Sequence, residues 1–463
     1  MRIRPLTQEQ FRDALGKGLG RAFLHVRHFG AAGLHEELLR ACLQSFAVDP
    51  QWEGTRADWI FAILKHSGEL DSFRQPVLAA LQGAVPGVTL YWDYVLWIKL
   101  ATKFALRGDQ LARQIIYRKF DEGAYDFSDA GRAVIQLDGM AGVLRVAEVV
   151  GARLREDVEF RDDNSFVSYA QKRFGEPSPF DNLLEEAFGS EMFTAPSIGD
   201  KPTVLEVLEA KSLESENVAA FLLSEKERRD RRSPAWGGTE RKLSLTDVMT
   251  GVENDQELDY MGFGRDTTES NALELFAWLL EERDPKRLFR LLEVFQLRRI
   301  PYLDSRLFEL IESEDRYVRR AAARMLSNNR HEEIRRFALR MLREEDLNRR
   351  AVGCDLLALN ARGKDLRTIT DSLPTAGDPD ELHAIAEALL NIVGWRKHAE
   401  DANLLRWVYD YNACSHCRNG AVEYLLTRFG LPPEQAHECC WDCLDLTRRL
   451  VRKAERRRRR RDT

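Results

Sequence analysis

The stretch EDRYVRRAAARMLSN, residues 314–328, carries the pattern on which the fold prediction rests. Its Ala321 is followed five residues later by Leu326, and this spacing recurs three times toward the C-terminus. The four pairs are Ala321–Leu326, Ala351–Leu356, Ala384–Leu389 and Ala421–Leu426, with their alanines 30, 33 and 37 residues apart. A unit of this length holds two short helices, which bury their apolar faces only by stacking on neighbouring units. The sequence therefore predicts an array of helical hairpins.

This stretch resembles the second helix of a HEAT repeat, in which Asp315 in the turn and Arg319 in the helix bracket a valine. The segment EDLNRRAVGCDLLA repeats the theme with Asp346 and Arg350. The resemblance is clearest over residues 302–430. It implies an all-α, right-handed α-solenoid of HEAT-like helical-hairpin repeats and, most often, a scaffold that binds a partner. It implies no chemistry.

The rest of the chain is also predicted to be helical. Apolar residues recur at helical spacing, and the alternation typical of strands is nearly absent. Hydrophobic residues make up 44% of the 463 residues, which is enough to bury an interior. The predicted organisation is an N-terminal helical unit of irregular HEAT-like hairpins at 1–189, an irregular insertion or hinge at 190–267, a C-terminal HEAT-like array with a Cys-rich capping hairpin at 268–446, and a basic tail at 447–463.

The tail differs in charge from the rest of the chain. Residues 447–463 hold ten basic residues against Glu455 and Asp462, whereas the whole chain has a formal net charge of −6. The remainder is therefore acidic, and the run Arg456–Arg461 is interpreted as a solvated, disordered end that can touch nucleic acid or another polyanion. No signal peptide or membrane span is visible, and seven cysteines fit a reducing compartment. We expect a soluble, cytoplasmic protein with no membrane contact.

Five of the seven cysteines lie within CSHCRNGAVEYLLTRFGLPPEQAHECCWDC, residues 414–443. Cys414, Cys417, Cys440 and Cys443 form a C-x2-C-x22-C-x2-C pattern, which is close to that of a structural zinc site. Two alternatives stay open, because the thiols can also pack as small hydrophobic groups or serve redox or catalytic chemistry. Four cysteine ligands would fill the coordination shell and leave no position for catalysis. We predict a capping hairpin, with structural zinc as its candidate cofactor.

The glycine-rich motif GKGLGR contains Gly16, Gly18 and Gly20. It follows no strand and lacks the order of residues in a phosphate-binding loop. Close helix packing or a kink is the interpretation that we favour.

Two sets of side chains are candidates for binding a partner. Aromatic and charged residues gather in the N-terminal part, at Trp52, Arg56, Asp58, Trp59 and Trp92. A ridge of arginines in the C-terminal array includes Arg319, Arg320, Arg349 and Arg350. The first set has the residue types of a base-binding groove, and it also fits core packing or a protein interface. The second set fits either a polyanion-binding stripe or a solvated face of ion pairs.

No catalytic triad, H-E-x-x-H sequence or Walker motif is visible. We therefore predict a non-catalytic scaffold or adaptor that binds a protein partner. One alternative is a nucleic-acid-binding solenoid that uses the arginine ridge and Arg456–Arg461. The other is an enzyme of the base-excision type, similar to the alkylpurine DNA glycosylases that are built from HEAT-like repeats.

Overall fold

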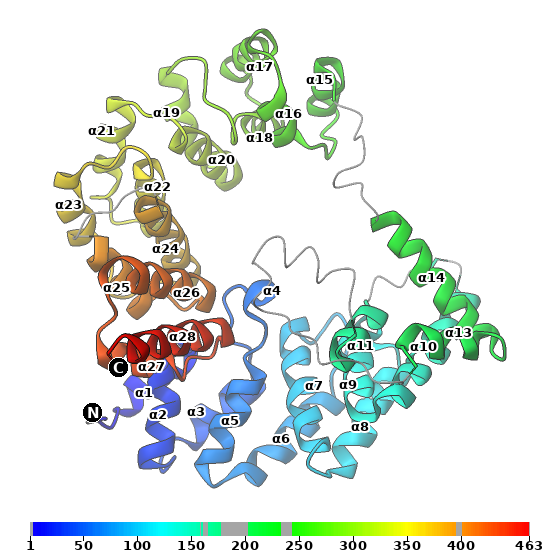
Figure 1. Cartoon of the computed structure of the whole chain (residues 1–463). Coiled ribbons are helices and arrows are strands. Elements are labelled where there is room, and N and C mark those ends of the chain that lie inside the picture. The colour runs from blue at the N-terminus through cyan, green and yellow to red at the C-terminus, as the bar shows by residue number, and fades with distance from the viewer. Residues whose placement is uncertain are drawn as a thin grey trace.

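The computed structural model describes residues 3–157, 159–160, 165–176, 202–232, 243–394 and 401–462. In these ranges every regular element is a helix, which confirms the all-α prediction. The helices follow an arc that bends back on itself, so that the last helices lie beside the first (Figure 1). Among the described residues, no helix is both long enough and apolar enough to cross a membrane.

The N-terminal half of the arc runs from α1 to α14. Its elements are α1 (Gln8–Lys17), α2 (Gly20–Phe29), α3 (His35–Leu43), α4 (Pro50–Glu53), α5 (Ala57–Ser67), α6 (Leu70–Gln82), α7 (Tyr91–Ala105), α8 (Gln110–Asp121), η1 (Ala124–Phe127), α9 (Ser128–Asp138), α10 (Met140–Glu156), α11 (Phe166–Phe174), α13 (Val204–Ser212) and α14 (Glu216–Arg232). Helix α7 packs against α6, α8 and α9. Its sequence is apolar nearly all round because it is covered on several sides.

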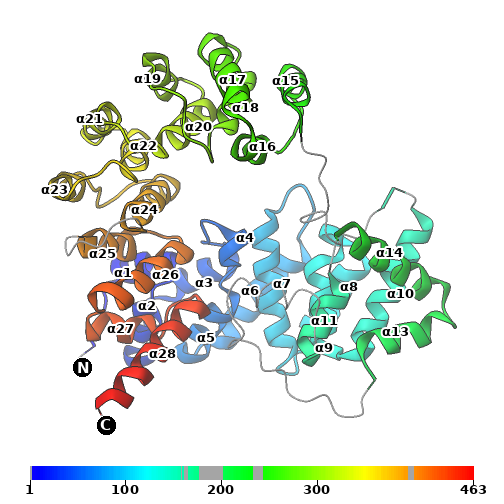
Figure 2. The same ribbon diagram turned by 45° about the horizontal axis from the view of Figure 1, so that its top comes forward.

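The C-terminal half runs from α15 to α28. Its elements are α15 (Leu245–Glu253), α16 (Tyr260–Asp266), α17 (Glu269–Glu281), α18 (Pro285–Val294), α19 (Ser305–Ile311), α20 (Arg316–Ser327), α21 (Glu332–Met341), α22 (Leu347–Leu357), η3 (Gly363–Asp365), α23 (Leu366–Asp371), α24 (Pro379–Gly394), α25 (Asp401–Tyr411), α26 (Ser415–Tyr424), η4 (Leu425–Phe429), α27 (Pro433–Cys439) and α28 (Asp445–Asp462). Helices α18, α20, α22, α24, α26 and α28 pack on one another in order and form an inner layer. Helices α17, α19, α21 and α25 pack on its outer side (Figure 2).

A recurring pair of contacts fixes where the inner helices begin. The carboxylates of Asp315 and Asp346 accept hydrogen bonds from backbone N–H groups in the first turns of α20 and α22. Arg319 and Arg350 come four residues after these aspartates, and each donates a hydrogen bond to the backbone carbonyl six residues before the arginine. Arg418 and Arg448 make the same contact without the aspartate. The four pairs with this separation are Arg319 to Ser313, Arg350 to Glu344, Arg418 to Asn412 and Arg448 to Asp442. The Asp–Arg pattern of the sequence therefore has a structural cause, and the arginine contact extends beyond the segments that show the full pattern.

Two buried asparagines, Asn329 and Asn360, make the same set of hydrogen bonds just after α20 and α22 end. Asn329 accepts a hydrogen bond from the backbone N–H of Ile300 at 3.1 Å, and Asn360 accepts one from that of His331 at 2.9 Å. Each amide also donates to the carbonyl four residues before it. Asn360 further donates to the carbonyl of Asn329 at 2.8 Å. These bonds join each unit to the next and satisfy carbonyls that a helix end would otherwise leave unpaired.

The two ends of the chain are joined by a contact that we call the terminal closure, made by α1–α5 against α26–α28. The ring of Trp441 stacks on Phe23, with the ring centroids 4.8 Å apart. The carbonyl of Trp441 accepts a hydrogen bond from the indole N–H of Trp59 at 2.8 Å. The backbone N–H of Cys443 donates to the carbonyl of Gly18 at 2.9 Å. The hydrophobic core of the N-terminal half accordingly includes side chains from the last fifty-five residues.

The glycine-rich motif lies at the terminal closure, which confirms the prediction of close helix packing. A Cβ on Gly20 would lie 2.0 Å from the carbonyl oxygen of Glu438. A Cβ on Gly18 would lie 2.4 Å from the sulfur of Cys443, and its φ of +75° is in the left-handed region. Among the described residues, and apart from its own helix backbone and chain neighbours, Gly16 has no atom within 4 Å of that position. Gly20 is therefore required for two backbones to meet, and Gly18 is required by its left-handed φ and its contact with the Cys443 side chain.

Two buried ion pairs lie at the terminal closure, one within each end of the chain. The Nη2 atom of Arg56 lies 2.7 Å from a carboxylate oxygen of Glu53, and that of Arg418 lies 3.3 Å from one of Asp442. Arg56 also donates to the carbonyls of Gly16 and Ala413, one from each end of the chain. Although burial opposes ionisation, the Arg56 charge and backbone N–H groups hold the pKa of Glu53 at about 2.

The basic tail differs from the prediction of a disordered end. Residues up to Asp462 continue α28, which packs against α26 and α27. Thr447 and Val451 are buried on one side of this helix, whereas Arg452, Arg456 and Arg457 are exposed. Burial of one face explains why a sequence so rich in arginine forms a helix here. The side chains of residues 459–461 lie outside the described part of the chain.

The predicted insertion or hinge at 190–267 lies partly outside the described residues, since 190–201 and 233–242 are not described. The helices that are described in this range pack on their neighbours. Helices α13 and α14 pack against α10, and α15 and α16 pack against α18. The division into four parts stays a prediction.

Candidate anion-binding groove and metal-ligating cluster

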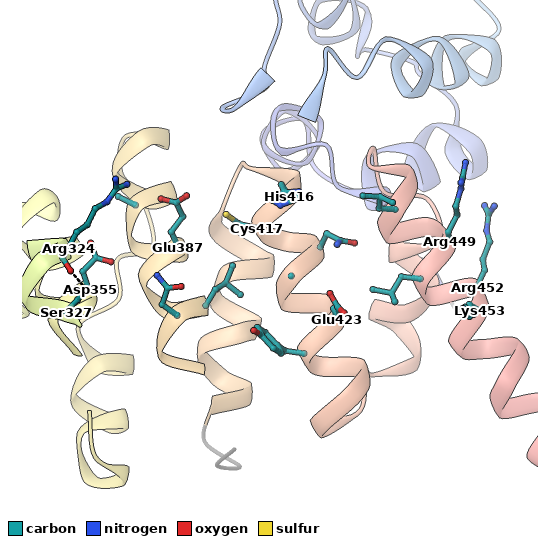
Figure 3. Close-up of a pocket in the computed structure, with 18 of the residues that line it drawn as sticks. Arg324, Ser327, Asp355, Glu387, His416, Cys417, Glu423, Arg449, Arg452 and Lys453 are labelled. Carbon is teal, nitrogen blue, oxygen red and sulfur yellow. Dashed lines mark hydrogen bonds between the residues drawn. The ribbon is translucent and has the colours of Figure 1, made fainter. Parts of the chain in front are cut away.

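The inner layer of the C-terminal half forms a groove of about 1610 Å³, which we call the inner groove. Helices α20, α22, α24, α26 and α28 contribute side chains to it, most of them at helical spacing. The charged and thiol groups of the lining are Arg320 and Arg324 on α20, Asp355 on α22, Glu387 on α24, His416, Cys417 and Glu423 on α26, and Arg449, Arg452, Lys453, Arg456 and Arg457 on α28. Figure 3 shows these helices side by side, with their side chains facing the same space.

The charges of the inner groove are arranged as two basic flanks and a mixed centre. Arg324 lies at one end, and Arg449, Arg452 and Lys453 lie at the other (Figure 3). The centre holds carboxylates together with the amides of Asn391 and Asn419. Seven basic side chains face three carboxylates, so the formal charge is +4 when all are ionised. The field of the groove therefore favours anions.

One of the three carboxylates loses its charge near neutral pH. Burial raises the pKa of Asp355 to about 7, although Arg324 and Arg320 act in the opposite direction. Glu387 adds to the upward shift because its own negative charge lies nearby. Glu387 is in turn 3.7 Å from Arg320. The positive charge of the groove consequently increases as the pH falls through 7.

A second cluster lies at the edge of the inner groove, where α24 meets the start of α26. The ligand atoms of His383, Cys414 and Cys417 all lie within 4.8 Å of one another, and such a set could hold a metal ion. The sulfur of Cys417 is 3.5 Å from Nδ1 of His383. Hydrogen bonds from Cys417 and His383 lower the pKa of Cys414 to about 5, even though burial acts against this shift. Contact with Cys414 raises the pKa of His383.

The other two cysteines of the predicted zinc pattern lie elsewhere. Cys443 is at the terminal closure, where its sulfur is 3.7 Å from Arg418 and next to Gly18. Cys440 is buried at the end of α27, and its carbonyl accepts a hydrogen bond from Arg452. Within the described residues, the structure groups Cys414 and Cys417 with His383 and not with Cys440 or Cys443. The cysteine spacing could not reveal His383 as a ligand. This histidine directly precedes the repeat alanine Ala384, at the position that Arg320 and Arg350 occupy in the first two units.

The aromatic set of the N-terminal half does not converge on one surface. Arg56 and Trp59 are buried in the terminal closure, whereas Trp52 is 72% exposed. Asp58 is exposed and pairs with Lys103. Trp92 is half-buried against Tyr91. The Trp–Asp pairing that a base-excising pocket needs is therefore not formed between Trp59 and Asp58, because one faces the core and the other faces solvent.

The arginine ridge also divides into two kinds of residue. Arg319 and Arg350 donate to backbone carbonyls at the starts of α20 and α22, so they serve the fold. Arg349 is half-buried and lies 3.7 Å from Glu344. Arg320 alone of the four lines the inner groove. On α28, the predicted basic run supplies Arg456 and Arg457 to the groove, whereas Arg449, Arg452 and Lys453 were not singled out, because the side they face depends on how this helix is buried.

Comparison of the chain with protein-family models, with curated proteins and with solved structures gives no match.

Proposed function

We propose that the chain is a non-catalytic, HEAT-like α-solenoid that binds single-stranded nucleic acid in its inner groove. The observation that carries this proposal is the arrangement of two basic flanks around a mixed centre. A nucleic-acid strand presents a phosphate at every nucleotide, and basic side chains that follow such a backbone supply most of the affinity. The proposed solenoid supports this role because its inner layer forms a long surface from local contacts.

The mixed centre favours nucleic acid over an acidic peptide. Glu387 and Glu423 would repel acidic side chains that point into the centre of the groove, whereas a nucleic-acid strand can turn its bases toward the centre and its phosphates toward the basic residues. Bases are neutral, and their amino groups donate hydrogen bonds that carboxylates accept. The amides of Asn391 and Asn419 can donate or accept, which suits base edges as well. A strand with phosphates at the flanks and bases at the centre therefore satisfies both parts of the lining.

Fluorescence anisotropy with a labelled single-stranded oligonucleotide tests this proposal across a range of salt concentrations. The test variant Arg324→Glu/Arg456→Glu reverses one charge on each flank. The control variant Arg336→Glu/Arg343→Glu changes the charge equally, at two exposed arginines outside the groove lining. We expect the test variant to lose at least about tenfold in affinity, and the salt slope to fall by about 0.7 for each phosphate that is no longer neutralised. Equal affinities of the two variants would contradict the proposal.

A protein partner, which the sequence favoured, is the second candidate. The loop between α6 and α7 exposes apolar side chains at Val85, Val88 and Leu90, with 52%, 82% and 71% of their surface accessible. Apolar groups gathered in one exposed loop are typical of a protein interface. A partner retained by the chain at high salt, and released on the triple change of these residues to serine, would support this candidate. Loss of that partner in the Arg324→Glu/Arg456→Glu variant would instead assign it to the inner groove.

The predicted zinc also belongs to this proposal as a structural element. Thiolate and imidazole groups are ligands that zinc prefers, and the cluster offers both. Its set of ligands does not depend on what the inner groove binds.

A further inference from the structure

The positions of Cys414 and Cys417 follow from how α26 begins. Cys414 is the residue just before the helix, and Cys417 is one turn into it. Side chains three residues apart lie on one face of a helix, so both sulfurs are on the side that faces α24. His383 comes from the first turns of α24, and its Nδ1 atom faces the sulfur of Cys417. Three ligand atoms thus meet from two helices that pack on each other.

The spacing of these atoms suits zinc. Zinc bonds of about 2.3 Å to sulfur and about 2.0–2.1 Å to nitrogen, at tetrahedral angles, place a sulfur and a nitrogen ligand about 3.6 Å apart. The distance between Cys417 Sγ and His383 Nδ1 is 3.5 Å. Cys414 completes a set whose members are all within 4.8 Å. Only small side-chain movements are needed to bring the three ligands to one ion.

The surroundings of His383 have the second feature of a metal-binding histidine. Its other ring nitrogen, Nε2, lies 3.6 Å from a carboxylate oxygen of Glu387, one turn further along α24. Metal-binding histidines commonly donate their second N–H to a carboxylate, which fixes the ring and leaves the opposite nitrogen free for the metal. Because Glu387 is on the Nε2 side of the ring, it orients the histidine and is not itself positioned as a ligand.

We propose that His383, Cys414 and Cys417 bind one zinc ion that joins α24 to α26, with solvent from the inner groove as the fourth ligand. Cys417 lines the groove, so the remaining coordination position is on the groove side. This ligand set differs from the four-cysteine set predicted from the sequence. A site with three protein ligands and a solvent molecule keeps a position open to small anions, whereas four cysteines would close it.

The test measures metal bound to the purified full chain by elemental analysis, in the unmodified protein and in three variants. We expect about one zinc per chain in the unmodified protein and in Cys440→Ser, and its loss in His383→Gln and Cys417→Ser. Absence of metal from the unmodified protein would overturn the proposal. Zinc that is retained in His383→Gln and lost in Cys440→Ser would also overturn the proposal, because the four-cysteine site predicts that result.

A second measurement needs no variant, so it does not depend on each variant folding. The unmodified protein is alkylated with and without prior chelation, and each cysteine is read by mass spectrometry. We expect chelation to increase labelling of Cys414 and Cys417 and to leave that of Cys440 unchanged. Equal labelling in both conditions, or protection that includes Cys440, would overturn the proposal. In the cobalt-loaded protein, azide should shift the visible bands, and no shift would refute the solvent ligand.

Discussion

Replacing Gly20 by alanine tests whether the terminal closure is a tight backbone contact. A Cβ at this position would lie 2.0 Å from the carbonyl oxygen of Glu438 and 2.9 Å from the carbonyl carbon of Trp441. Both are backbone atoms, so no side-chain rotation relieves the clash. Overpacking of this kind costs about 1–3 kcal/mol. The turn between α27 and α28 must therefore move away from α2.

The loss of stability at the terminal closure should be measurable as faster amide exchange and faster thiol labelling of Cys443. Its backbone N–H donates to the carbonyl of Gly18, and burial raises the pKa of its thiol to about 11. If opening of the terminal closure becomes easier by about 1–3 kcal/mol, exchange of this amide should speed up by about 5- to 150-fold. Labelling of the thiol at about pH 8 should accelerate as well, because the open form exposes it and returns its pKa toward the ordinary value.

Gly16→Ala is the matched control. It makes the same chemical change in the neighbouring helix, where no other described part of the chain comes within 4 Å of the added methyl group. Alanine also favours a helix over glycine by about 1 kcal/mol, so this variant should be unchanged or slightly more stable. Hydrogen exchange and thiol labelling are measured on both variants. Equal rates at Cys443 in the two variants would refute the reasoning.

Three further predictions concern side chains in the C-terminal half. The affinity for a single-stranded oligonucleotide should rise by about fivefold between pH 8 and pH 6, since Asp355 takes up a proton as the pH falls through its pKa of about 7; in Asp355→Asn, binding measured by anisotropy should lose this part of the pH dependence. Asn360→Ala should destabilise the array by about 1–3 kcal/mol in urea unfolding, because a buried N–H and two carbonyls lose their partner. Arg319→Ala should lower the thermal midpoint with little effect on oligonucleotide affinity, because Arg319 holds a backbone carbonyl. Arg320→Ala should lower oligonucleotide affinity with little effect on the thermal midpoint, because of these two residues only Arg320 lines the inner groove.

The sequence predicted those features that depend on contacts within a unit or between adjacent units. The Ala–Leu register, the Asp–Arg pattern and the all-helical class follow from local spacing, and the buried alanines of α20 and α22 lie where that spacing put them. The glycines also indicated close packing, but not the partner, because α27 and α28 lie more than 400 residues away.

The candidate sites were less predictable because their side chains come from separate helices. The helix at Arg456–Arg461 continues a segment whose other face is covered by α26 and α27, and charge alone suggested disorder. Cys414 and Cys417 were identified from spacing, whereas His383 comes from a unit that departs from the repeat pattern. Cys440 and Cys443 are oriented by the terminal closure, which no local pattern records.

The terminal closure also sets an order of events during synthesis. Gly18 and Cys443, which are hydrogen-bonded to each other, are 425 residues apart in the chain. At a translation rate of about 5–20 residues per second, α1, α2 and α5 leave the ribosome roughly 20–85 s before the helices that cover them. During that interval Phe23 and Trp59 lack the contacts that they later make with Trp441, so these faces are exposed to solvent. The nascent chain must therefore keep these faces from aggregating until α27 and α28 have been synthesised.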